Sequence, residues 1–90
     1  MKEITKNDIQ TLIDFVDERG NTMTIANIAN VNENIDSIYL YLKDSEEDFP
    51  NKDEVIEHLK YLSELIRNTQ YVNLVSFILI GLNGIMGLLK

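Results

Sequence analysis

Cysteine and tryptophan are absent from this 90-residue chain, and proline and histidine occur once each. Without cysteine there is no disulfide framework, thiolate metal site or thiol nucleophile. A single histidine argues against a catalytic triad, and no glycine-rich phosphate loop is present, so we expect no enzyme, no cofactor and no metal. One proline, four glycines and no strand-like run of β-branched residues indicate an all-helical fold.

Basic residues are also scarce. Eight lysines and arginines stand against fifteen aspartates and glutamates, which gives a net charge of −7, and none of the basic residues lies between Asn21 and Leu42. Because DNA-binding proteins usually neutralise phosphates with a basic face, a monomer would bind DNA weakly. A dimer or a protein partner would be needed. Seven acids lie between Asp44 and Glu57, and this acidic surface is a candidate contact for a protein partner.

Ninety residues are enough for one domain with a modest core, so we expect a single domain over residues 1–90. No basic and then apolar signal opens the chain, which favours the cytoplasm. The pattern of apolar residues predicts about five helices. They form a helix-turn-helix-like unit over residues 7–49 and a C-terminal helical hairpin over residues 51–90.

Three short helices are expected in the first half. The first begins at Asn7 or Asp8 and ends at Gly20, where a left-handed backbone is least costly. The second follows Thr22 or Thr24 as its cap, and an Asn-rich turn at 30–34 separates it from a third, tyrosine-bearing helix. The alternative is one continuous helix over residues 25–43.

The second half begins with a polar linker that contains Pro50, which bars continuation of the preceding helix. Asn51 and Glu54 resemble a capping box that opens a helix to about Thr69. The last helix runs from about Asn73 to Lys90.

Val72 to Leu89 is a stretch of eighteen residues without a charge, which is long enough to span a membrane. A helix that is apolar nearly all round must be buried, in lipid, in the core or in a dimer. At 100° per residue, one face gathers small and polar residues beside Ile80. We therefore expect a dimer or membrane helix interface of Asn73, Ser76, Ile80, Asn83, Gly84 and Gly87.

Three segments of residues 9–49 are similar to the DNA-binding region of tetracycline-repressor-type (TetR) regulators. They are Phe15 to Gly20, Thr24 to Ala29 with its Thr-Ile-x-x-Ile-Ala order, and Ile38 to Phe49 with its Tyr-x-Tyr pair. Winged-helix regulators share the Ile-Ala pattern. The resemblance implies a helix-turn-helix that places the tyrosine-bearing helix in the major groove.

The resemblance also implies which residues contact DNA. In the family, tyrosine hydroxyls contact phosphates, a serine at the helix start reaches a base edge or phosphate, and the capped second helix aims N–H groups at a phosphate. The DNA-binding residues expected on this basis are Thr24, Asn34, Ser37, Tyr39, Tyr41 and Lys43.

Three functions therefore remain open. The first is a small transcriptional regulator that binds DNA as a homodimer. The second is an acidic protein-interaction module, such as a phage or plasmid inhibitor, an antitoxin or an immunity protein. The third is a small protein anchored in the membrane by its C-terminal helix.

Overall fold

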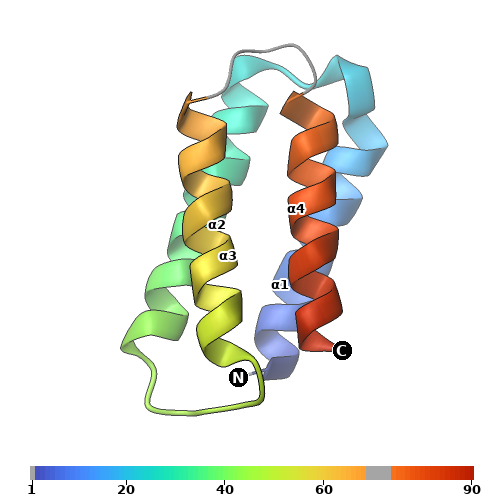
Figure 1. Ribbon diagram of the computed structural model, residues 1–90. Helices are drawn as coiled ribbons and strands as arrows, with labels where there is room; N and C mark the ends of the chain where they lie inside the picture. Colours follow the sequence, from blue (N-terminus) through green and yellow to red (C-terminus); the bar gives the residue numbers. More distant parts are fainter. Residues whose placement is uncertain (1, 69–73) are drawn as a thin grey trace.

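Four α-helices make up the fold in the computed structural model, which describes residues 2–68 and 74–90 (Figure 1). The helices are α1 (Lys2–Arg19), α2 (Ile25–Asp44), α3 (Lys52–Asn68) and α4 (Leu74–Leu89), and a short 3₁₀ turn, η1 (Gly20–Thr22), follows α1. No strand occurs in the described part of the chain. The all-helical prediction is confirmed, but the number of helices is four and not five.

Helix α1 begins earlier than expected, at Lys2 and not at Asn7 or Asp8. The added first turn is held because Thr5 is fully buried and continues the inner face of the helix toward Val16. Gly20 ends the helix as predicted, with a φ of 48° that a residue without a side chain adopts freely.

Helix α2 is continuous, so the prediction of two helices separated by a turn at 30–34 is wrong and the one-helix alternative is right. Its inner residues recur every three or four positions straight through the Asn-rich stretch, and this regular stripe keeps the backbone helical. The amide of Asn34 donates to the backbone and side-chain oxygens of Asn30, each at 2.8 Å, so the asparagines are accommodated along the helix surface. The stripe comprises Ile28, Val31, Ile35, Ile38 and Leu42.

Thr24 caps this helix, as the sequence indicated. Its hydroxyl accepts from the N–H of Asn27 at 3.1 Å, and the Asn27 side chain accepts from the N–H of Thr24 at the same distance. The two bonds satisfy two N–H groups that a helix start leaves without partners. The entry to α2 is therefore fixed.

The linker between α2 and α3 is tied down by Lys52. Its ammonium group donates to the carbonyl oxygen of Ser45 at 2.9 Å and also to that of Glu47. Asn51 adopts the left-handed conformation with a φ of 68°, and its amide donates to the carbonyl oxygen of Leu88 at 3.4 Å. The Asn51 bond joins the start of α3 to the end of α4, and the Lys52 bonds hold the linker against the start of α3.

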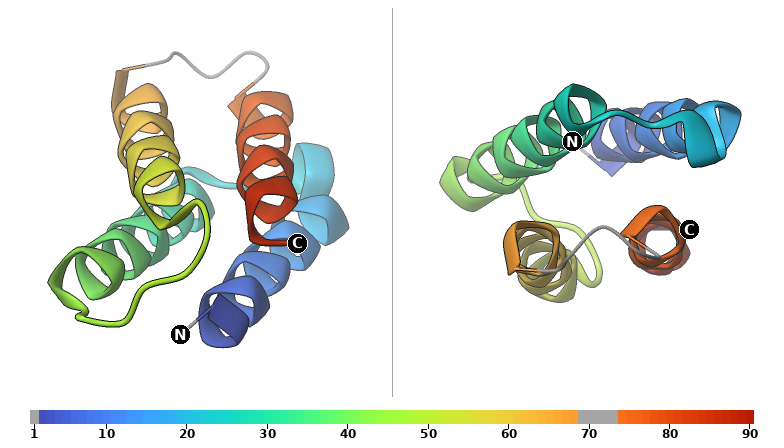
Figure 2. Two further views of the ribbon diagram at one scale, coloured as in Figure 1. Left: turned by 60° about the horizontal axis from the view of Figure 1, so that its bottom comes forward. Right: turned by 90° about the horizontal axis from the view of Figure 1, so that it is seen from above.

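The helices form two layers, with α1 and α2 in one and α3 and α4 in the other (Figure 2). Helix α1 packs mainly on α4, α2 mainly on α3, and α3 on α4, whereas α1 and α2 make little contact with each other. All four helices contribute fully buried side chains to one core, for example Ile9, Ile35, Leu59 and Ile78. The weak contact between α1 and α2 leaves a seam along the outside of their layer.

Candidate binding groove between α1 and α2

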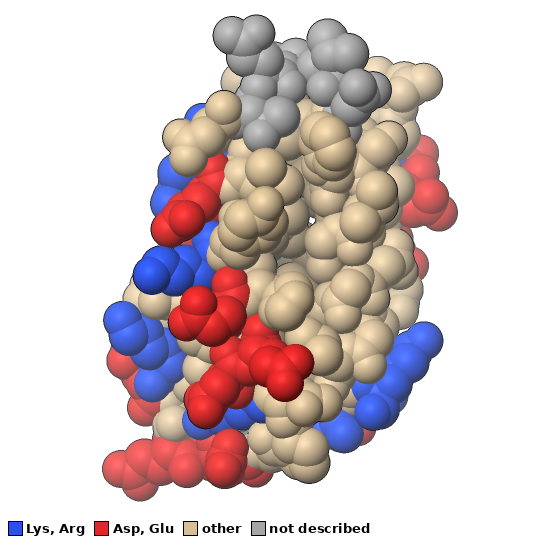
Figure 3. Space-filling view, viewed as in Figure 1, with Lys and Arg blue, Asp and Glu red and all other residues tan. Residues whose placement is uncertain are grey.

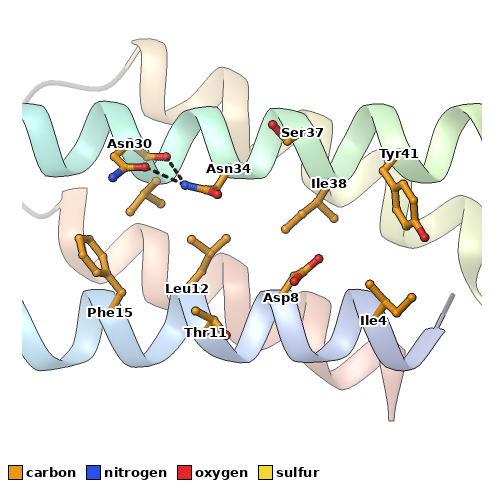
Figure 4. A pocket seen from close by; sticks show the side chains of 11 residues that line it. Ile4, Asp8, Thr11, Leu12, Phe15, Asn30, Asn34, Ser37, Ile38 and Tyr41 are labelled. Atoms are coloured by element: carbon orange, nitrogen blue, oxygen red, sulfur yellow. Dashed lines mark hydrogen bonds between the residues drawn. The ribbon is translucent and has the colours of Figure 1, made fainter.

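The seam between α1 and α2 is a groove of about 600 Å³ (Figure 4). In the figure the two helices run side by side, and side chains from both point into the space between them. From Ile4 to Phe15 the groove follows twelve residues of α1, which is about 16 Å of helix. A space of this length matches about three turns of another helix.

The floor of the groove is apolar and belongs to the core. Leu12, Val31 and Ile38 line it, and each exposes less than a tenth of its surface. Two larger side chains stand at one end, where Ile4 is 51% exposed and Tyr41 is 46% exposed. The groove thus offers apolar surface that the fold itself leaves uncovered.

Most polar side chains of the walls are bonded within their own helix. Besides the Asn30 and Asn34 pair, the hydroxyl of Ser37 donates to the carbonyl oxygen of Glu33 at 3.0 Å, and that of Thr11 to the carbonyl oxygen of Asn7 at 2.9 Å. Such bonds hold side chains against the helix and leave the middle of the groove open. The walls can therefore admit an apolar partner without losing a hydrogen bond.

Carboxylates set the charge of the groove. Asp8 lies in its wall, is exposed, and forms no ion pair among the described residues. Helical spacing puts Glu33 and Asp44 beyond the α2 wall, within one turn of Ser37 and Tyr41 respectively. The one cation near the groove on the described part of α1 is Arg19, whose guanidinium lies 4.4 Å from the centre of the Phe15 ring, at one end.

The structure brings together half of the residues that the TetR resemblance assigned to DNA. Asn34, Ser37 and Tyr41 line the groove. Thr24 is the α2 cap, and Tyr39 and Lys43 lie on another side of α2, where the Lys43 ammonium is 5.6 Å from the centre of the Tyr39 ring. The two tyrosines face different sides of α2, because Tyr39 packs against the core and Tyr41 is exposed.

Sequence reasoning missed the wall that α1 supplies. Ile4, Asp8 and Phe15 fall outside the buried stripe of α1 and share one side of the helix. The signal was present as two apolar residues off the buried face, eleven positions apart. These two residues indicate a groove wall only once α2 is known to lie beside α1.

A second, smaller cavity of about 350 Å³ lies between α2 and α3, and Tyr39 and Leu40 line it. Beside it the carboxylate of Asp36 accepts from the hydroxyl of Ser63 at 2.6 Å and from the guanidinium of Arg67 at 2.5 Å. This network joins α2 to α3 across the cavity, which Lys60 and Glu64 also line.

The residues predicted for a dimer or membrane interface share the outer face of α4. Ser76, Ile80, Asn83, Gly84 and Gly87 are all exposed, and Asn73 lies outside the described residues. No described helix combines the length and hydropathy needed to cross a membrane. In Figure 3 this face forms a broad surface without charge.

The acidic stretch from Asp44 to Glu57 covers the end of α2, the linker and the start of α3. Within the described residues, no cluster of three or more histidine, aspartate or glutamate side chains is arranged to hold a metal ion. No family model, curated protein or solved structure matches the chain.

Proposed function

We propose that this protein is an acidic helical protein-interaction module, and that the groove between α1 and α2 binds a basic amphipathic helix of a partner protein. The observation that carries the proposal is an open groove between two helices, with nearly buried core residues at its floor, exposed Ile4 and Tyr41 at one end and the carboxylate of Asp8 in its wall. An amphipathic helix binds such a groove with apolar residues spaced three, four and seven positions apart.

The charge of the chain favours a basic occupant. A net charge of −7 attracts cationic partners over distances of about a Debye length, and Asp8 offers a carboxylate inside the groove itself. An apolar stripe flanked by lysine or arginine would meet the floor and the edges together. Inhibitors and antitoxins that cover basic surfaces of other proteins use this complementarity.

DNA binding by the tyrosine-bearing segment stays a prediction. The interpretation required a separate recognition helix after a turn, and α2 contains no such turn. The groove also combines its three candidate DNA contacts with carboxylates, which repel phosphate. These features support a protein partner over a nucleic acid.

A synthetic helical peptide tests the proposal. An amphipathic peptide of leucine and lysine, about twelve residues long to match the groove, is titrated into the isotopically labelled protein and followed by NMR. A matched leucine and glutamate peptide is the control. We expect amide shifts confined to α1 and α2 with the lysine peptide and no binding of the glutamate peptide.

Variants sharpen this test. Asp8→Lys should weaken the lysine peptide by about tenfold, because it replaces attraction by repulsion inside the groove. Asp53→Lys makes the same charge change at an exposed position of α3 and should have a much smaller effect. An equal loss of peptide affinity in both variants would mean that the peptide is attracted by the net charge alone and does not bind in the groove. Shifts at Ser37 and Tyr41 on adding duplex DNA, with none from either peptide, would favour the regulator instead.

A further inference from the structure

The outer face of α4 carries large apolar side chains that nothing in the fold covers. Ile80 is 69% exposed and Phe77 is 42% exposed, and Tyr61 of the neighbouring helix α3 is 66% exposed. No charged residue lies on α4 from Leu74 to Leu89. Figure 3 shows this face as the uncharged part of a surface whose borders carry charges of both signs.

Glycines on the same face are not explained by packing within the chain. A Cβ added at Gly81 would lie 2.7 Å from a methyl carbon of Leu62, so this glycine allows α3 and α4 to approach. A Cβ added at Gly84 or Gly87 would meet nothing within 4 Å. Because glycine weakens a helix interior relative to alanine, these two glycines suit an approach from outside the chain.

The large and the small positions are arranged symmetrically along α4. Ile80 and Gly84 lie two residues on either side of Leu82, and Phe77 and Gly87 lie five residues on either side. If a second α4 runs antiparallel across the first with a two-fold axis near Leu82, each large side chain of one copy faces a glycine of the other. Closed dimers are built on such self-complementary surfaces.

We infer that this protein forms an antiparallel homodimer through the outer face of α4, in which Ile80 and Phe77 of one copy fill the spaces above Gly84 and Gly87 of the other. The dimer is independent of the α1–α2 groove, which lies between other helices and stays open. Because the contact involves one helix face and the edge of α3, we expect a small interface and a dimer that dissociates at about micromolar concentrations.

Sedimentation velocity across the micromolar range measures the association. Gly84→Ile fills the space above Gly84, and Ile80→Asp puts a charge in the contact. Each should weaken the dimer by at least about tenfold. Ile25→Asp, at a residue of α2 that is 72% exposed, is the matched control and should leave it unchanged. Circular dichroism checks that the variants fold. A wild-type chain that is monomeric at every concentration overturns the proposal.

Introduced cysteines test the antiparallel register, because the natural chain has none. Phe77→Cys and Gly87→Cys chains carrying tags of different mass are mixed and oxidised. We expect a disulfide between the two different chains in preference to either symmetric one. Ser76→Cys alone should not cross-link, since an axis near Leu82 separates the two cysteines by about 18 Å along the helices. Rapid cross-linking of Ser76→Cys would mean a parallel dimer and would overturn the inference.

Discussion

The groove between α1 and α2 and the outer face of α4 both expose apolar surface, yet they arise differently. The groove exists because α1 and α2 pack mainly on different partners, so nearly buried core residues such as Leu12 and Ile38 form its floor. The α4 face exists because α4 is apolar over a wider arc than α1 and α3 cover. One surface is a concave part of the core with carboxylates nearby, and the other is a convex helix face without charge.

The comparison shows that apolar residues at a surface can contribute to the stability of the fold, to binding, or to both. Residues at a groove floor contribute to folding as well as to binding, so both stability and binding restrict which residues can stand there. Residues on a convex helix face contribute little to folding, so selection for stability alone does not explain them. The α4 face is in this respect the stronger indication of a contact.

The largest expected effect separates the two surfaces by stability. Ile38→Ala removes a nearly buried side chain from the groove floor and should lower the free energy of unfolding by about 2–4 kcal/mol. Ile80→Ala, at an exposed position, should lower it by less than about 0.5 kcal/mol. Urea denaturation at low protein concentration measures both. Similar losses would mean that Ile80 also packs within the fold.

The second comparison concerns glycines of one helix. Gly84→Ala should raise the free energy of unfolding by about 0.5–1 kcal/mol, because alanine favours the helix and meets no neighbour. Gly81→Ala gains the same propensity but overpacks Leu62, which typically costs about 1–3 kcal/mol. Thermal unfolding of the two variants should therefore differ in sign, or at least by about 1 kcal/mol. Equal values would contradict the close approach of α3 and α4.

Much of the fold followed from periodic patterns. The all-helical class, the cap at Thr24 and the end of α1 at Gly20 were predicted from local signals that the structure confirms. The continuity of α2 was not chosen, because a run of asparagines suggests a turn when taken alone. The stripe from Ile28 to Leu42 outweighs that preference, because tertiary burial contributes more than intrinsic propensity.

The candidate sites divide in the same way. Ser76, Ile80, Asn83, Gly84 and Gly87 were predicted to share one helix face, because 100° periodicity relates residues of a single helix, and they lie together on the outer face of α4. The groove was not predicted, because it forms between two helices that lie side by side. The pattern of residues along the sequence does not say which helices are neighbours. Three residues of its α2 wall, Asn34, Ser37 and Tyr41, were named in advance, but as DNA contacts and not as the lining of a groove.

A third prediction strengthens the fold without altering either surface. The hydroxyl of Thr5 is buried and has no hydrogen-bond partner among the described residues. Thr5→Val keeps the shape and removes the unpaired polar group, so it should raise the free energy of unfolding by about 1 kcal/mol. Peptide binding and self-association should stay unchanged. A loss of stability would mean that the hydroxyl has a partner outside the described residues.

The smallest effect distinguishes the two surfaces by salt. Peptide binding in the groove should weaken several-fold as ionic strength rises, since screening reduces the attraction of a chain of net charge −7 for a cationic helix. Asp8→Asn should weaken it by only a few-fold, because an exposed charge pair is worth about 0.2–1 kcal/mol.

Self-association through α4 should change little with ionic strength. The α4 face carries no charge, so screening acts on it only by relieving the repulsion between two acidic chains. Isothermal titration for the groove and sedimentation for the dimer, at the same salt concentrations, provide the comparison. A parallel decline in both would mean that charge attraction also governs the α4 contact.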